Sequence, residues 1–465
     1  MLAPSRRPSR PRRTAAFAFI VVAASSSKAF AASPERSLGI GAPQAIGFDD
    51  AIERAISRYP SARAAEADVE RARADFARAR SQSMPALNGS LSHLGVDSVS
   101  LDGQATRIGL ASNQAQLSLS VPLFDPRAWA DWSEGKEKIE VADARLSNER
   151  RRVALAAGRA WTAVLAADHV LALHEEALRT AEAHRTFTVG RVSGGIGTEL
   201  DVVRANKEVE SVRGLVELAT SDCVRAREIL GVLTGVNGAV DVRADDTGEI
   251  SADAKSSMSV GVASGARIDH RPDVVAARVA HESARNERKH SYTDYLPSMR
   301  LDADAFYQDE PTPILPVSGV GYIVKLTLSV PIYDGGLRPA RSRARRADEA
   351  AASARLEEVT RSARAEARID GDRLKHAELA WDDARKAATL ARRTVDLTRQ
   401  RYADGLGTDL DVIDALRESR NSDIAAAVAE QTVLVARLDW LAAEGVLPTL
   451  SRDAHGSRHE SKGTY

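Results

Sequence analysis

The stretch RYADGLGTDLDVID, residues Arg401–Asp414, decides how this chain folds. Gly405 and Gly407 interrupt a long, highly charged helical segment, and either Thr408 or Asp409 can cap a helix that starts after them. The new helix then opens with closely spaced acids, which are Asp409, Asp411 and Asp414. A helix that breaks at glycines and restarts at once predicts the tip of a helical hairpin.

A second copy of this signature occurs earlier in the chain, as RVSGGIGTELDVV at Arg191–Val203. The two copies share their glycines, their threonine and one acid. The matched pairs are Gly195 and Gly405, Gly197 and Gly407, Thr198 and Thr408, and Asp201 and Asp411, each 210 residues apart (405 − 195 = 210). A hairpin tip that recurs at a constant offset predicts a duplicated architecture.

The composition favours long helices over a thick globular core. Charged residues make up 28% of the 465 residues but nearly cancel, with a formal net charge of −1, so nothing in the charge balance supports a nucleic-acid partner. Aromatic residues are only 5%, and alanine is abundant. Because Cys223 is the only cysteine, neither a disulfide framework nor a four-cysteine metal site is expected.

The first 31 residues have the pattern of a signal peptide. A run of arginines precedes the short apolar segment Ala15–Ala24, and Ala29–Ala31 reads as an A-x-A cleavage site. The apolar segment is too short to cross a bilayer, which takes about 20 residues. No cysteine lies at the cleavage site, so N-terminal lipidation by that route is not expected.

Each half of the chain predicts two amphipathic strands. The segment QLSLSVPLFD (116–125) alternates apolar and polar residues, and KLTLSVPIYD (325–334) matches it position by position. The predicted strands cover residues 87–99, 111–124, 299–307 and 322–333, and SVSLDGQATR (98–107) is predicted to be a polar loop.

Very long helices are predicted to flank these strands. A segment from Pro126 to about Val192 has no internal proline and would span on the order of 100 Å at ~1.5 Å per residue. After Gly335, small and apolar residues keep a 4,3 spacing that indicates a supercoiled seam. These residues are Ala363, Ala367, Asp370, Leu374, Ala377, Trp381, Ala384, Ala388, Ala391, Val395, Thr398 and Tyr402.

The predicted organisation is therefore two similar repeats with short flanking segments. A signal peptide (1–31) and an N-terminal linker (32–47) precede a first helix–strand–helix repeat (48–236). A connector (237–267), a second repeat (268–447) and a disordered tail (448–465) follow.

Four strands per chain cannot close a barrel by themselves. Single-chain membrane barrels begin at 8 strands, and an open sheet edge leaves backbone groups unsatisfied in lipid. Several copies of the chain must then contribute their strands to one barrel. The residues leave the number open, since two copies would give 8 strands and three would give 12.

Motifs along the chain resemble those of TolC-like outer membrane efflux proteins, the outer membrane factor family. They are HRPDVVAAR (270–278), YLPSMRL (295–301), LSVPIYDGGLRPAR (328–341) and RYADGLGTDLDVIDA (401–415). The resemblance implies a homotrimer with a 12-stranded β-barrel in the outer-membrane lipid, continued by an α-helical tunnel through the periplasm. It also implies docking to an inner-membrane ABC or proton-driven transporter through a periplasmic adaptor.

The resemblance places the hairpin tips at the periplasmic mouth, where Asp411 and Asp414 match a pair of pore-constricting aspartates. Residues three apart share a helix face, so a trimer would present rings of carboxylates that attract cations. The alternative is that these acids only favour the helix N-terminus, by roughly 0.3–1 kcal/mol. That interpretation suits Asp409 and Asp411 better than Asp414, and both can hold for Asp411.

The resemblance also implies contacts that close the mouth. Tyr402 matches a tyrosine with this role in the family, and Asp201 on the first hairpin is a candidate partner. At the position of Gly407, members of the family can have an arginine that helps to hold the mouth closed. Arg401, Arg204 or Arg191 could take over that contact in this chain. Arg204 also occupies the position equivalent to Asp414, so no second acidic ring is expected on the first hairpin.

The predicted function is the exit duct of a tripartite efflux or type I secretion system. The missing lipidation cysteine favours protein export, for example of a toxin, and a multidrug or metal efflux channel of a proton-driven pump is the alternative. A periplasmic coiled-coil scaffold without a pore would leave the amphipathic strands unexplained. No catalytic motif or cofactor-binding pattern occurs, and the histidines are expected at solvated or seam positions rather than around a metal, so an enzyme is not expected.

Overall fold

The structure is a computed structural model that describes residues 45–96, 99–101, 104–106, 110–243, 268–309 and 319–445. The predicted signal peptide and C-terminal tail lie outside these residues, as do most of the predicted linker and connector. All described residues belong to one compact unit.

The first half contains the helices α1 (Phe48–Arg58), α2 (Pro60–Ser81), α3 (Pro126–Ser193) and α4 (Glu199–Thr234). Proline stands at the first position of both α2 and α3, where its missing N–H costs nothing. Asp125 caps α3 by accepting a hydrogen bond of 3.1 Å from the Ala128 amide. Gly235 ends α4 in the left-handed conformation, with φ of 68°.

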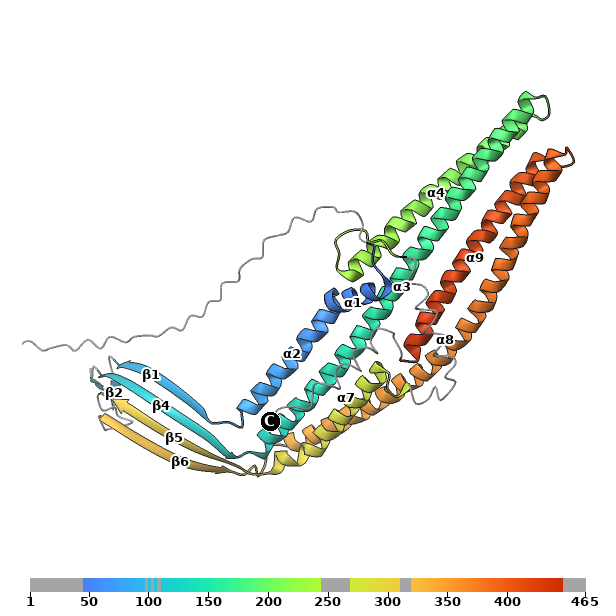
Figure 1. Ribbon diagram of the computed structural model, residues 1–465. Coiled ribbons are helices and arrows are strands. Elements are labelled where there is room, and N and C mark those ends of the chain that lie inside the picture. The colour runs from blue at the N-terminus through green and yellow to red at the C-terminus, as the bar shows by residue number, and fades with distance from the viewer. Residues whose placement is uncertain are drawn as a thin grey trace, which may run out of the picture. The chain divides into compact units, whose positions relative to one another are not determined.

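The second half repeats this order with α7 (Pro272–Lys289), the 3-10 helix η2 (His290–Tyr295), α8 (Leu337–Ala403) and α9 (Asp409–Ala443). Two hairpins result, α3 with α4 and α8 with α9 (Figure 1). At 68 and 67 residues, α3 and α8 are each about 100 Å long, as the sequence predicted. Among the described helices, none has a stretch apolar and long enough to cross a bilayer.

Four antiparallel strands form one sheet in the order β1 (Ala86–Val96), β4 (Leu110–Phe124), β5 (Ser298–Gln308) and β6 (Gly319–Ser329) (Figure 1). The central pair, β4 with β5, joins the two halves of the chain. The last strand ends earlier than predicted, at Ser329, because Pro331 lacks the N–H that a further ladder bond would need.

The predicted polar loop between the first two long strands is not wholly irregular. It contains the short antiparallel pair β2 (Val99–Leu101) and β3 (Gln104–Thr106). The alternation within each three-residue strand is too short to be recognised as a strand period.

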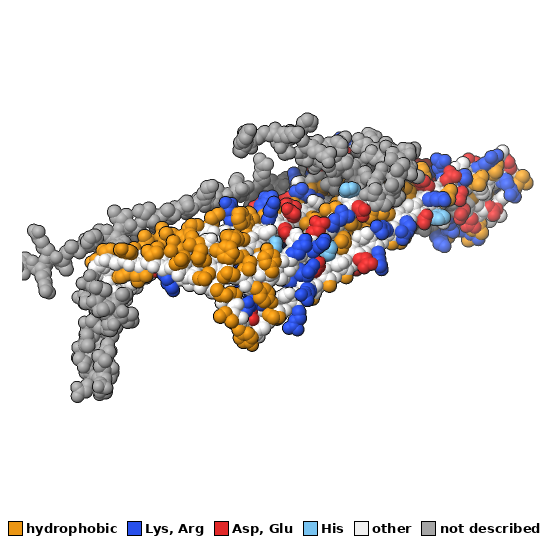
Figure 2. Space-filling view, turned by 90° about the horizontal axis from the view of Figure 1, so that it is seen from below, with side chains coloured by type: hydrophobic (Ala, Val, Ile, Leu, Met, Phe, Trp, Pro, Cys, Tyr) orange, Lys and Arg blue, Asp and Glu red, His pale blue; other side chains and the backbone are white. Residues whose placement is uncertain are grey.

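The sheet has one apolar and one polar face, as the alternation predicted. Leu119, Ala303 and Val324 lie side by side on the apolar face. On the polar face the Ser120 hydroxyl donates to Asp302 at 2.7 Å. Large apolar side chains stay exposed on the strands, including Tyr322 at 83%. Figure 2 shows hydrophobic side chains gathered over the strands, with charged side chains over the helices.

Small residues form the seam along which α8 packs on α9. Every position of the predicted 4,3 pattern is buried or half-buried, and Ala363 is fully buried. Alanine allows two helices to approach closely, so the seam is narrow and most of the other residues of α8 face outward. At Gly371, an added Cβ would lie 3.6 Å from the Trp440 ring.

The largest apolar cluster joins α1, α3 and α9. Trp161 is fully buried and meets Phe48 edge-on, with ring centroids 5.5 Å apart. The Trp161 indole N–H donates to the Ile46 carbonyl at 3.2 Å, so the residues just before α1 are also fixed.

A buried arginine explains the HRPDV motif of the second half. Arg271 donates to Asp273 at 2.7 Å and to Glu366 of α8 at 2.6 Å. Both of these bonds come from Nη2, whereas Nη1 donates to the Ala443 carbonyl at the end of α9, at 3.4 Å. The motif therefore ties the start of α7 to both helices of the second hairpin.

Candidate functional site: the hairpin tips

The two hairpin tips have the same backbone construction. Gly195 and Gly405 both adopt φ of 78°, a conformation that favours glycine. Each following residue closes the turn with an amide hydrogen bond of 2.9 Å, Ile196 to Arg191 and Leu406 to Arg401. Gly197 and Gly407 then lead into Thr198 and Thr408, which cap the next helix as the sequence allowed. Both tips are thus tight, hydrogen-bonded turns that lead directly into a capped helix.

Asp411 completes the cap of α9. Its carboxylate accepts from the Thr408 amide at 2.9 Å, and its own amide donates to the Thr408 hydroxyl at 3.2 Å. The backbone hydrogen bond from Thr408 holds the pKa of Asp411 below its usual value. The exposed side chain is therefore ionised at neutral pH even while it acts as a cap.

Asp414 lies three residues further along and plays no part in the cap. Its side chain is 60% exposed, and its nearest cation is Arg417, at 3.7 Å on the same helix. Asp411 and Asp414 thus present two negative charges on the exposed face of α9, while Val412 and Ile413 between them are buried.

Asp409, expected to serve only as an acid at the helix N-terminus, is instead buried at 2% exposure. His184 Nε2 lies 2.8 Å from its Oδ1, and the Thr188 hydroxyl donates to the same oxygen at 3.2 Å. His184 and Thr188 belong to α3, so this carboxylate links the two hairpins. Nothing local in the sequence signals the contact, because the partners are 225 and 221 residues away.

Tyr402, at the end of α8, adds a second link between the hairpins. A hydrogen bond joins its hydroxyl to Thr188, and burial, followed by the nearby Asp409, raises its pKa. The Arg191 guanidinium lies over the Tyr402 ring, 4.4 Å from its centroid, and donates to the Tyr402 carbonyl at 2.7 Å. Of the arginines considered from the sequence, Arg191 is the one that reaches across.

The other predicted closing residues make contacts within their own hairpins. Asp201, proposed as the partner of Tyr402, accepts from the Thr198 amide at 3.0 Å and so caps α4. Arg204 lies 3.9 Å from Asp201 on the same helix. Arg401 donates to the Leu406 carbonyl at 3.4 Å, across its own turn. Within the described part of one chain, the hydrogen bonds and ion pairs of these three residues stay inside their own tips, although the charge of Asp201 contributes to the raised pKa of Tyr402.

Comparison with known proteins identifies the fold family. The profile of the outer membrane efflux protein family matches residues 51–236 and 265–446, which cover most of the chain. The chain belongs to the outer membrane efflux protein family. This membership confirms the predicted resemblance.

Individual members of the outer membrane efflux protein family align along most of their length. TolC of Escherichia coli K12 is 23% identical over 419 residues, covering 87% of this chain and 83% of TolC. PrtF of Dickeya chrysanthemi, a proteases secretion protein, is 23% identical over 406 residues, covering 83% of this chain and 85% of PrtF. The crystal structure of CusC superposes with a TM-score of 0.73 at 17% identity, covering 88% of this chain and 96% of CusC.

The predicted fold class is thereby confirmed. Outer membrane efflux proteins combine barrel strands with a helical tunnel, and they act from the outer membrane into the periplasm. They form trimers and work with adaptor proteins and inner-membrane pumps. This chain is accordingly an exit duct of an efflux or type I secretion system.

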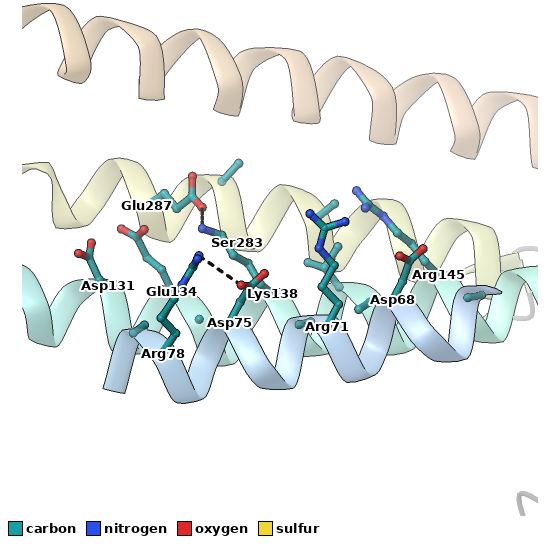
Figure 3. A pocket seen from close by; sticks show the side chains of 18 of the residues that line it. Asp68, Arg71, Asp75, Arg78, Asp131, Glu134, Lys138, Arg145, Ser283 and Glu287 are labelled. Atoms are coloured by element: carbon teal, nitrogen blue, oxygen red, sulfur yellow. Dashed lines mark ion pairs between the residues drawn. The ribbon is translucent and has the colours of Figure 1, made fainter. Parts of the chain in front are cut away.

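Away from the tips, this outer membrane efflux protein has a cavity of about 680 Å³ among α2, α3 and α7 (Figure 3). Glu134 lines it at 8% exposure, and its Oε1 has no hydrogen-bond partner within the described part of the chain. Burial, and then the negative charge of Glu287, raises the pKa of Glu134 to about 7. Glu134 was not singled out from the sequence, because its burial arises from packing between separate helices.

Proposed function

We propose that the two hairpin tips form the gate of the duct and that Asp411 and Asp414 line its constriction in a homotrimer. The observation that carries the proposal is the exposure of Asp414, 60% for its side chain, at a position where it caps nothing. Each copy would contribute both carboxylates, so a threefold arrangement gives two stacked rings of negative charge.

In this gate, the buried contacts beside the rings keep the mouth closed. Asp409 with His184 and Thr188, and Tyr402 with Arg191, fix the second hairpin against the first. The duct itself is a passive conduit without catalytic chemistry, and opening requires that such contacts separate. The inner-membrane pump and its periplasmic adaptor, which meet the duct at this end, would supply the work.

The ring assignment is tested by single-channel recording in planar bilayers. Divalent cations should block the native channel from the periplasmic side, because they bind between closely spaced carboxylates. The double variant Asp411→Asn with Asp414→Asn should need about tenfold more cation for half-block, corresponding to ~1.4 kcal/mol of lost binding.

A matched control is Asp404→Asn, which removes an exposed aspartate from the turn of the same tip. This variant should leave the block nearly unchanged, since Asp404 precedes the helix that carries the rings. Equal block in the native channel and the double variant would refute the ring assignment.

We further propose that the cargo is protein and that the partners are an ATP-driven exporter and its adaptor. One relative, PrtF, is named for protease secretion, and the predicted cleavage site lacks a lipidation cysteine. Cross-linking of the duct in intact cells should capture an ABC exporter with its adaptor. Capture of a proton-driven pump instead would favour drug or metal efflux.

A further inference from the structure

A buried carboxylate on the first hairpin contacts two arginines of the second. Glu208 of α4 is 4% exposed. Arg417 of α9 donates to one of its oxygens from Nε at 2.7 Å and also lies within 2.6 Å through its terminal nitrogen. Arg420, one turn further along α9, donates to the other oxygen at 3.2 Å. Both Glu208 oxygens are thus held by guanidinium groups of the other hairpin.

The packing between the hairpins is incomplete at this level. A cavity of about 360 Å³ lies among α3, α4, α8 and α9, and Glu208 and Arg420 belong to its lining. Removing one partner of a buried charge pair leaves the other uncompensated, at a considerable cost in free energy. The ionic contact is therefore a specific link between α4 and α9.

Arg417 stands between two carboxylates. Its guanidinium binds Glu208 closely, and it also lies 3.7 Å from Asp414, one turn back on α9. With Arg420, the group has two positive and two negative charges and is balanced. If Glu208 lost its charge, Asp414 would be the one anionic partner left to Arg417 among the described residues, at the i, i+3 spacing that suits an ion pair on a helix.

We propose that Glu208 is a positioning residue of the gate. By holding Arg417 against α4 at 2.6 Å, it keeps the contact between Arg417 and Asp414 at 3.7 Å, so that the Asp414 carboxylate is only weakly paired and can still bind cations in the pore. This inference rests on the proposed role of Asp414 in the constriction. Glu208 does not face the cation itself, and it acts only through the placement of Arg417.

The test uses the full-length trimer in planar bilayers with magnesium ions as the blocking cation. Glu208→Gln should raise the concentration for half-block by about fivefold, because Arg417 then pairs with Asp414 and neutralises one charge per protomer. The double variant Glu208→Gln with Arg417→Gln should return half-block to within about twofold of the native value, because the competing cation is gone.

A merely structural role for Glu208 predicts the opposite for the double variant, which would lack both sides of the link and stay impaired. Glu210→Gln is the matched control, since Glu210 is 68% exposed on the same helix and pairs with Arg213. Its half-block concentration should equal that of the native channel.

The outcomes separate this inference from the proposed gate. If Asp411→Asn with Asp414→Asn weakens the block while Glu208→Gln does not, the gate stands and the role of Glu208 is refuted. If adding Arg417→Gln to Glu208→Gln does not restore the block, the role of Glu208 is likewise refuted and the gate stands. If the double aspartate variant leaves the block unchanged, the gate assignment itself is overturned.

Discussion

Glu134 makes the packing of α2, α3 and α7 sensitive to pH. Its pKa is about 7 in the folded chain against an ordinary value of 4.5, chiefly because burial disfavours the charged form. The folded state therefore binds this proton more tightly than the unfolded state does. Stability is highest below about pH 4.5 with respect to this group, and it falls as the pH rises through 7.

Replacing Glu134 with glutamine should remove this dependence. At pH 8 the Glu134→Gln variant should be more stable than the native chain by about 1–2 kcal/mol, because solvent in the cavity screens part of the effect, whereas at pH 4 the two should be equal. Thermal denaturation of the detergent-solubilised trimer at both pH values measures the difference. Glu140→Gln, at an exposed site on α3, is the control and should show no such gain. A variant less stable than the native chain at pH 8 would contradict the assigned protonation.

At the level of helices and hairpins, the sequence allowed us to predict structures that form within one segment of the chain. It did not allow us to predict side-chain contacts between segments that are far apart in the sequence. The glycine turns, the threonine caps and the alanine seam each depend on residues within a few turns of each other, so the sequence shows them directly. The pairing of Asp409 with His184 depends on how α9 lies against α3, and the two residues are 225 positions apart. The same separation hid the contacts of Glu208 with Arg417 and Arg420.

The contact between the two hairpins should weaken when the buried carboxylate of Asp409 is removed. Asp409→Ala should leave His184 and Thr188 without their shared acceptor, which costs about 2 kcal/mol for hydrogen bonds to a charged group. Amide hydrogen exchange in residues 184–193 should then rise by roughly tenfold or more.

The control for this variant is Asp404→Ala in the exposed turn of the same tip. Its exchange rates in residues 184–193 should match those of the native chain. If Asp409→Ala left the exchange unchanged, the buried pair would not be what holds the hairpins together.

For the whole molecule, the duplicated sequence pattern predicted four strands per chain, and it predicted that several chains must combine their strands to close a barrel. The residues alone did not determine how many chains combine. The reason is physical: strand alternation encodes which face meets lipid, whereas the closure of a barrel depends on how edges of separate chains meet. In one chain β1 and β6 are the outer strands of the described sheet. Trimers of this family supply the partners for both edges, which removes unpaired backbone groups from the bilayer.

The orientation of the sheet can be tested with two neighbouring residues of β6. Val324 lies beside Ala303 on the apolar face, and Ile323 lies beside Asp304 on the polar face. Arginine facing lipid near the bilayer centre costs about 2–4 kcal/mol, whereas arginine facing an aqueous lumen is tolerated. Val324→Arg should therefore sharply reduce the heat-resistant trimer in the outer-membrane fraction, while Ile323→Arg should assemble at close to native levels. Equal loss from both substitutions would contradict the assigned faces, because the two positions share one strand and differ only in the side to which they point.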